Sequence, residues 1–300
     1  MTLCRDGKIS LACYAFAAIV VGLPDILYYL QLNTYPRGSS EVVFDFIGIV
    51  NITRFYIVHA LQFLALNFFV ILAFRGFTYQ VAVRSTFLGY VFGFGLHTAI
   101  RGQPSWTIFG LYLAVLATFH YSEFLVIAWT NPSAATIDTF VLQHSLAYSV
   151  AACSSWFEFL MEHHFFPWLK YFTPISFAGL AMCIGGEALR KTAIFTAKRN
   201  FNHLVQTEKS DDHELVTHGV YGLCRHPSYV GWFYWSIGTQ LILQNPFCAV
   251  AYALASWRFF HDRVLLEEIT LLNFFGPAYV EYQKKVGTGL PFIHGYRINL

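Results

Sequence analysis

Long apolar runs separated by short polar stretches make up most of the chain. A helix that crosses about 30 Å of hydrocarbon needs roughly 20 apolar residues. A late run, 229–260, contains Gln244, Asn245 and Pro246 near its middle, which predicts a tight turn between two helices. The pattern therefore predicts an all-α, polytopic membrane protein with about eight transmembrane helices, the last two forming a helical hairpin. The six predicted spans before the hairpin cover residues 10–30, 44–74, 81–100, 106–129, 137–162 and 171–195.

The composition agrees with a membrane protein. Hydrophobic residues make up 56% of the 300 residues and charged residues only 12%, about half the fraction of charged residues in a typical soluble domain. The formal net charge is only +2, so the composition does not indicate a basic surface that binds nucleic acid. Since no internal repeat or linker is visible, we expect one integral membrane domain over 1–300. Its parts are a six-span scaffold (1–197) and a catalytic region (198–300) that includes the hairpin at 229–260.

The distribution of lysine and arginine sets the expected orientation, because cytosolic loops carry an excess of these residues. With eight spans, Arg37, Arg101 and Lys170 fall on one side of the membrane. A larger group falls on the other side, which we assign to the cytosol: Arg5, Lys8, Arg75, Arg84, Arg190, Lys191, Lys198, Arg199, Lys209, Arg225, Arg258, Arg263, Lys284 and Lys285.

Two features inside the predicted spans need an explanation. Glu123, Glu158 and Glu187 are acidic residues in apolar surroundings, so each is either functional, paired with a neighbouring span, or close to the membrane interface. Gly89 and Gly93 form a GxxxG pattern, which predicts close helix packing.

Several site classes are excluded by missing motifs. The twelve histidines form no pair of histidine boxes and the six cysteines form no CxxC, so no metal site is expected. GxGxxG, Walker A and GxSxG patterns are absent. A Rossmann-type nucleotide-binding domain is therefore not expected.

The longest polar stretch, 201–232, is the main candidate for chemistry. It ends in the sequence RHPSY (225–229), directly before an apolar run. Pro227 suits the first turn of a helix, and the positive end of that helix would suit a carboxylate or another anion. A basic interfacial anchor is the alternative. Beyond the hairpin, Arg263 and Glu267 lie four residues apart, which suggests either a surface ion pair or a functional pair.

Four stretches closely resemble the isoprenylcysteine carboxyl methyltransferase family of the endoplasmic-reticulum membrane. The RHPxY element alone also resembles phospholipid methyltransferases and membrane sterol reductases, whereas TGLPFI together with the WRFFHDRVLLEE stretch looks specific to the carboxyl methyltransferases. The matching stretches are LVTHGVYGLCRHPSYVGWFYWSIGTQ (215–240), WRFFHDRVLLEE (257–268), FFGPAYVEYQKKV (274–286) and TGLPFI (288–293).

The resemblance implies methyl esterification, dependent on S-adenosylmethionine, of the C-terminal prenylcysteine carboxylate of farnesylated or geranylgeranylated CaaX-processed proteins, such as small GTPases. It implies a multi-pass endoplasmic-reticulum protein whose active site faces the cytosol and is built from 198–228 and the C-terminal region. Arg263 would bind the substrate carboxylate and act in catalysis with Glu267. The cofactor contacts carried over by position are Gln206, His213, Glu214, Leu215, Val216, Tyr221, His226, Pro227, Ser228, Tyr229 and Glu267.

Three other functions remain as alternatives. A phospholipid amine N-methyltransferase would need a base or a desolvated amine, and would not need Arg263 to bind a carboxylate. A sterol reductase should carry basic residues for the phosphates of NADPH. A non-enzymatic lipid receptor or transporter predicts no cofactor binding, and charges in 201–229 that can be changed without loss.

Overall fold

The computed structural model describes residues 2–24, 44–142, 145–209, 211 and 213–296, with side chains described from residue 57 onward in the second range. Every regular element in these ranges is a helix, which confirms the all-α prediction. The α-helices are α1 (Arg5–Val21), α3 (Phe44–Ala73), α4 (Gly76–Arg101), α5 (Pro104–Thr130), α6 (Leu146–Phe165), α7 (Pro174–Ala197), α8 (Pro227–Leu243), α9 (Pro246–Phe275) and α10 (Pro277–Lys285).

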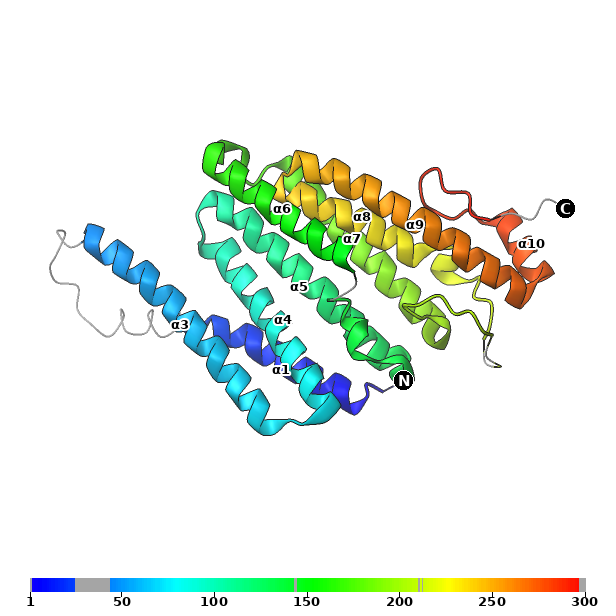
Figure 1. Cartoon of the computed structure of the whole chain (residues 1–300), viewed down its shortest axis with the longest axis horizontal. Helices are drawn as coiled ribbons and strands as arrows, with labels where there is room; N and C mark the ends of the chain where they lie inside the picture. Colours follow the sequence, from blue (N-terminus) through cyan, green and yellow to red (C-terminus); the bar gives the residue numbers. More distant parts are fainter. Residues whose placement is uncertain (1, 25–43, 143–144, 210, 212, 297–300) are drawn as a thin grey trace.

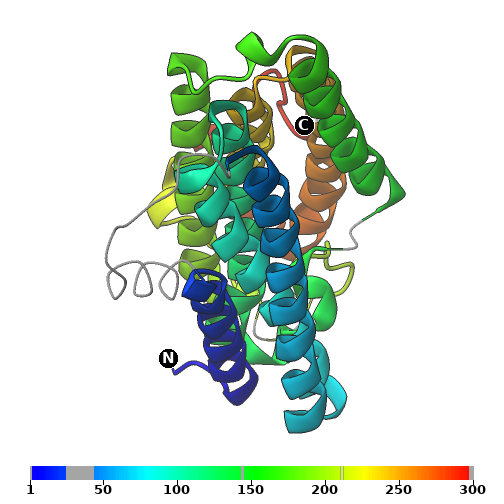
Figure 2. The same cartoon turned by 90° about the vertical axis from the view of Figure 1, so that its left-hand side faces the viewer.

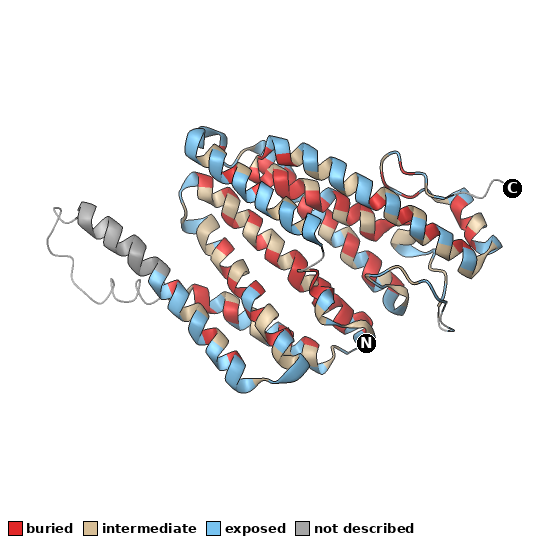
Figure 3. Ribbon diagram, in the orientation of Figure 1, coloured by how far each residue is buried: buried red, intermediate tan, exposed pale blue. Residues whose placement is uncertain are grey.

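Helix α5 lies between two groups of helices (Figure 1). Helices α1 and α4 pack on one side of it, with α3 packed on them, and α7 and α8 pack on the other, with α9 packed on α8. After a quarter turn, α1 and α3 lie nearest the viewer, in front of the other helices (Figure 2). Buried residues concentrate on α5 and α8, whereas the described parts of α3 and α6 are mostly exposed (Figure 3). This is the burial expected of two central helices with outer helices around them.

Small residues allow the backbones of neighbouring helices to approach. The GxxxG pattern of α4 packs against α1: a Cβ at Gly89 would clash with the backbone of Tyr14, and one at Gly93 would lie 2.5 Å from the Ala18 carbonyl oxygen. This confirms the predicted close packing. A Cβ at Gly186 of α7 would likewise lie 2.5 Å from the Gly231 carbonyl oxygen of α8. Helix α7 is therefore held close to the start of α8.

The predicted hairpin is confirmed. Helix α8 ends at Leu243, Gln244 takes a left-handed conformation (φ 54°), and α9 begins at Pro246. Glu158 caps α9 by accepting the Phe247 and Cys248 N–H groups at 2.8 and 2.7 Å. This role explains why an acidic residue is tolerated in α6, because a carboxylate is favourable at the N-terminus of a helix.

At the same turn, a buried lysine binds the C-terminal end of α8. The ammonium of Lys170 donates to the carbonyl oxygens of Leu243 and Gln244, each at 2.9 Å, and lies 2.5 Å from the Glu162 carboxylate. Lys170 therefore satisfies the last carbonyl groups of α8, which have no partner inside the helix.

One predicted span boundary is wrong. The fifth span was expected at 137–162, but α6 begins only at Leu146, where the Ser145 hydroxyl caps it. Residues 137–140 form a 3₁₀ turn instead, because Phe140 is buried and stacks on Phe124 of α5, with ring centroids 4.3 Å apart. The first span was expected at 10–30, and α1 accounts for its described part up to Val21. Residues 25–30 lie outside the described part of the chain.

Length and hydropathy single out one described helix. Pro104–Thr130 is long and apolar enough to cross a membrane, and Ile57–Ala73 is a shorter apolar helix. The number of spans therefore remains a prediction.

Candidate active site

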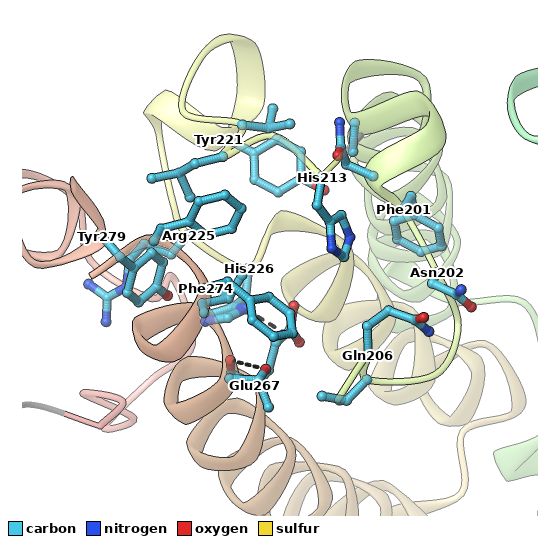
Figure 4. Close-up of a pocket in the computed structure, with 18 of the residues that line it drawn as sticks. Phe201, Asn202, Gln206, His213, Tyr221, Arg225, His226, Glu267, Phe274 and Tyr279 are labelled. Carbon is cyan, nitrogen blue, oxygen red and sulfur yellow. Dashed lines mark hydrogen bonds and ion pairs between the residues drawn. The ribbon is translucent and has the colours of Figure 1, made fainter. Parts of the chain in front are cut away.

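A cavity lies at the end of the bundle where α9 and the segment 198–226 meet (Figure 4). It encloses about 920 Å³ of empty space, part of it open to solvent. Side chains from the loop, such as His213, face Glu267 and Phe274 of α9 across it (Figure 4). All of the residues predicted to contact a cofactor line this first cavity: Gln206, His213, Glu214, Leu215, Val216, Tyr221, His226, Pro227, Ser228, Tyr229 and Glu267.

Glu268 organises one wall of the first cavity. Its carboxylate accepts hydrogen bonds from Arg225 Nε at 2.8 Å and His226 Nε2 at 3.0 Å, and it is fully buried. Burial alone would raise the pKa of Glu268, but His226 and Arg225 hold it below its usual range. The carboxylate is therefore ionised and fixes the orientation of His226. Three further donors come from the C-terminal region: the Tyr279 hydroxyl at 3.2 Å, Gln283 Nε2 at 3.1 Å and the Tyr296 N–H at 2.7 Å.

Tyr229 connects the two residues proposed for catalysis. Its hydroxyl donates to Glu267 Oε2 and accepts from Arg263 Nε at 3.2 Å. Arg263 and Glu267 therefore share the Tyr229 hydroxyl rather than forming a simple surface ion pair. Arg263 also donates from Nη2 to the His203 carbonyl oxygen at 2.6 Å, which fixes the orientation of its guanidinium group.

Arg263 lines a second cavity and is not among the residues that line the first. Arg190, Trp232 and Phe259 also line this second cavity. Tyr229 lines both, as do Phe201, Asn202 and Leu204. The two cavities thus adjoin at Tyr229, and the cationic side chain of Arg263 lies on the side of the second cavity.

A buried ion pair holds the second cavity together. Arg190 of α7 binds Glu123 of α5 through Nε at 2.6 Å and Nη2 at 2.7 Å, and its Nη1 donates to the Ser228 hydroxyl at 2.5 Å. His203 Nε2 lies 2.6 Å from the same carboxylate. Glu123 is therefore paired with neighbouring elements, one of the possibilities left open by the sequence. Glu187 is paired too, with Lys191 at 3.2 Å.

A third, apolar cavity lies among α4, α5, α6, α8 and α9. It encloses about 1470 Å³ of empty space, part of it open, and shares Trp232 and Phe259 with the second cavity. Two hydrogen bonds join α5 to α6 beside it, His120 Nε2 to the Tyr148 hydroxyl at 2.8 Å and Trp156 Nε1 to the Tyr112 hydroxyl at 3.1 Å. Polar, cationic and apolar cavities thus follow one another toward the bundle interior.

Sequence reasoning missed two residues of this arrangement. Glu268 lies in the matching stretch 257–268, and the two adjacent glutamates at the end of this stretch could have indicated it as a site residue. Arg190 was counted only as a charge at the end of a span. Within the described ranges, no group of three or more His, Cys, Asp or Glu side chains is arranged to hold a metal ion.

The helical bundle has a charged cavity at one end, and this cavity leads to an apolar cavity between the helices. This arrangement is typical of a membrane protein whose site binds one polar and one lipid-like ligand. The model of the isoprenylcysteine carboxyl methyltransferase (ICMT) family matches residues 179–273. The protein-S-isoprenylcysteine O-methyltransferases of Rattus norvegicus and Homo sapiens are 57% and 56% identical to this chain. Each alignment covers 98% of this chain and 96% of the relative.

A solved structure is also similar. The eukaryotic intramembrane Ras methyltransferase ICMT superposes with a TM-score of 0.88 at 47% identity, covering 98% of this chain and 99% of that one. The chain therefore belongs to the ICMT family of membrane methyltransferases.

Proposed function

We propose that the protein transfers a methyl group from S-adenosylmethionine to the C-terminal carboxylate of S-prenylcysteine on prenylated, CaaX-processed proteins such as small GTPases. The observation that carries this proposal is the order of the three cavities. A polar methyl donor, a carboxylate and a prenyl chain would each lie in a cavity of matching chemistry. Tyr229 lines both the first and the second cavity, and Trp232 and Phe259 line both the second and the third.

The first cavity fits S-adenosylmethionine. His213 Nδ1 is buried without a hydrogen-bond partner, and burial together with the nearby charge of Lys209 lowers the pKa of His213. The neutral ring can therefore bind a polar atom of a ligand. We assign the adenine to the backbone of Leu215 and Val216, and the ribose or amino-acid end to Glu267 and His226. Bound there, the cofactor would supply an electrophilic sulfonium methyl group.

The acceptor needs alignment rather than activation. A carboxylate is ionised at pH 7 and is already nucleophilic, so no general base is required. The guanidinium of Arg263 can hold it through two parallel N–H donors. Because Tyr229 and the His203 carbonyl already orient Arg263, the carboxylate would be held beside the junction with the first cavity. Arg190 also lines that cavity, with its charge paired to the Glu123 carboxylate.

The third cavity would take the prenyl chain. A chain of about 15–20 carbons gains roughly 0.8 kcal/mol per buried CH₂, so it favours an apolar environment. The substitution Ala152→Trp on α6 would fill part of this cavity. We expect it to lower kcat/KM for S-farnesylcysteine by about tenfold or more, with unchanged affinity for S-adenosylmethionine. Cys153→Trp is the matched control, since Cys153 is the exposed neighbour of Ala152. Equal turnover of A152W and C153W would place the prenyl chain elsewhere.

Glu267 is assigned to the cofactor. We expect Glu267→Ala to weaken S-adenosylmethionine binding by about 10- to 100-fold, the cost of losing a hydrogen bond to a charged group. The KM for the prenyl substrate should change much less. Calorimetric titration of the cofactor and steady-state kinetics separate these effects. An unchanged dissociation constant for S-adenosylmethionine would contradict the assignment.

We also propose the predicted membrane placement: eight spans in the endoplasmic reticulum, scaffold 1–197 and catalytic region 198–300. The first cavity lies near Lys209 and Arg225, at the end that the lysine and arginine distribution assigns to the cytosol. Because α9 has 30 residues, or about 45 Å, it is longer than the hydrocarbon layer and would carry Glu267 beyond it. The cofactor would arrive from the cytosol and the prenyl chain from the bilayer.

Methyl transfer from labelled S-adenosylmethionine to N-acetyl-S-farnesylcysteine in liposomes tests the proposed function. We expect a base-labile methyl ester on this acceptor and none on the S-methylated cysteine analogue. Absence of the ester with folded protein would overturn the proposal. Transfer to a phospholipid amine, or binding of NADPH, would then favour the phospholipid methyltransferase or the sterol reductase.

A further inference from the structure

The apolar cavity ends at a defined level. One lining residue from each of four helices marks this end: Tyr112 (α5), Trp156 (α6), Thr239 (α8) and Tyr252 (α9). One turn further along each helix, the corresponding residues are buried and do not line the cavity: Ile108, Phe159, Leu243 and Cys248. The four lining residues therefore form a floor under the cavity.

The floor lies a fixed distance from the proposed reaction centre. Trp232 and Phe259, at the junction with the Arg263 cavity, are two helical turns from Thr239 and Tyr252 respectively. Two turns correspond to about 10 Å. A ligand whose polar end is held at Arg263 would thus extend its apolar end toward the floor.

Polar contacts keep the floor in place. Trp156 Nε1 donates to the Tyr112 hydroxyl at 3.1 Å across the α5–α6 gap. Just below, the Ser155 hydroxyl donates to Gln240 Oε1 at 2.9 Å, and Asn245 Nδ2 donates to the Ser155 carbonyl oxygen at 2.8 Å. These contacts join α6 to α8 and to the hairpin turn, so the cavity cannot deepen by separation of the helices.

We propose that this floor, and Tyr252 in particular, determines the longest prenyl chain that the protein accepts. The inference rests on the proposed function. Farnesyl and geranylgeranyl chains have about 15 and about 20 carbons, and they differ in the terminal isoprene unit, the part that would reach the floor. Apolar pockets discriminate a single methylene by about 10- to 200-fold. A floor that contains the bulky side chains of Tyr112, Trp156 and Tyr252 would therefore select between the two chains.

Two substitutions test the proposal in opposite directions. Tyr252→Ala deepens the cavity, whereas Ala255→Phe, nearer the reaction centre on the same face of α9, makes it shallower. The measurement is the ratio of kcat/KM for N-acetyl-S-geranylgeranylcysteine to that for the S-farnesyl compound. We expect the ratio to rise by about tenfold in Y252A and to fall by about tenfold in A255F. Because both substrates are measured on one preparation, the ratio does not depend on the folded fraction.

Controls separate this proposal from the function on which it rests. Phe247→Ala removes an exposed aromatic side chain from α9 outside the cavity and should leave the ratio unchanged. Tyr252→Leu is a milder variant with the same expected direction. If wild-type protein methylates prenylcysteine but the ratio stays constant in Y252A, Y252L and A255F, the floor proposal is overturned alone. If wild-type protein methylates neither compound, the proposed function fails and the floor proposal with it.

Discussion

Replacing Arg263 by lysine is expected to reduce kcat/KM for N-acetyl-S-farnesylcysteine by about 100-fold or more, the usual cost of removing an oriented donor from a reacting oxygen. Lysine keeps the charge but loses the planar fork that binds a carboxylate through two donors. It also cannot retain both contacts of Arg263, to the His203 carbonyl and the Tyr229 hydroxyl. Since Arg263 lies outside the lining of the first cavity, affinity for S-adenosylmethionine should change little.

Turnover and cofactor titration on the same preparation check this expectation. Arg258→Lys is the matched control, because Arg258 is on the same helix but is largely exposed and pairs with the exposed Asp262 at 3.1 Å. That pair should contribute little to stability or activity. Unchanged turnover in R263K would remove Arg263 from carboxylate binding. A large loss of cofactor affinity would instead assign Arg263 to the first cavity.

The apolar pattern predicted the helices well because a long apolar run is a property of the local sequence. The hairpin turn was predictable because Pro246 and the two amides before it interrupt an apolar run, and α9 begins at Pro246. The start of α6 was not predictable in the same way. Residues 137–140 directly precede an apolar run and were assigned to the span, but packing of Phe140 on Phe124 holds them in a short turn. A tertiary contact therefore outweighed the local pattern.

The candidate site was predictable as a set of residues but not as an arrangement. Every residue assigned to the cofactor by resemblance lines one cavity, although their individual roles remain proposals. The sequence did not indicate that Tyr229 contacts both Arg263 and Glu267, or that Arg190 reaches Ser228 from another helix. Such contacts join residues distant in sequence, so no spacing rule reveals them.

The arrangement also explains how an aqueous and a lipid reactant could meet. Tyr229 is one of the residues between the first two cavities, and its hydroxyl contacts both Glu267 and Arg263. Its ring stacks on His226, with centroids 5.5 Å apart, and on Phe260 at 5.2 Å. Tyr229 is therefore held in a fixed orientation between the two cavities, which would favour a defined approach of the two proposed reactants.

Glu268→Ala is expected to give the largest loss of stability. The carboxylate and Arg225 are both buried and lie 2.8 Å apart, and removal of one partner from a buried pair costs about 3–5 kcal/mol because the other charge is left unpaired. The Tyr296 N–H would also lose its acceptor, so the C-terminal residues should detach from α9. Thermal unfolding in detergent and protease sensitivity near residue 290 measure both effects.

Matched variants define the pH dependence of the same cluster. Because His226 and Arg225 hold the pKa of Glu268 below its usual range, the ionised carboxylate stabilises the fold fully above the usual pKa, and this stabilisation is lost as the pH falls through the lowered value. Glu268→Gln keeps the shape but should lack this loss in acid. Glu281→Ala is the control, since its pair with Lys284 is exposed and should contribute little. If E268A and E281A unfold at the same temperature as the wild type, the Glu268 cluster does not hold the C-terminal region in place.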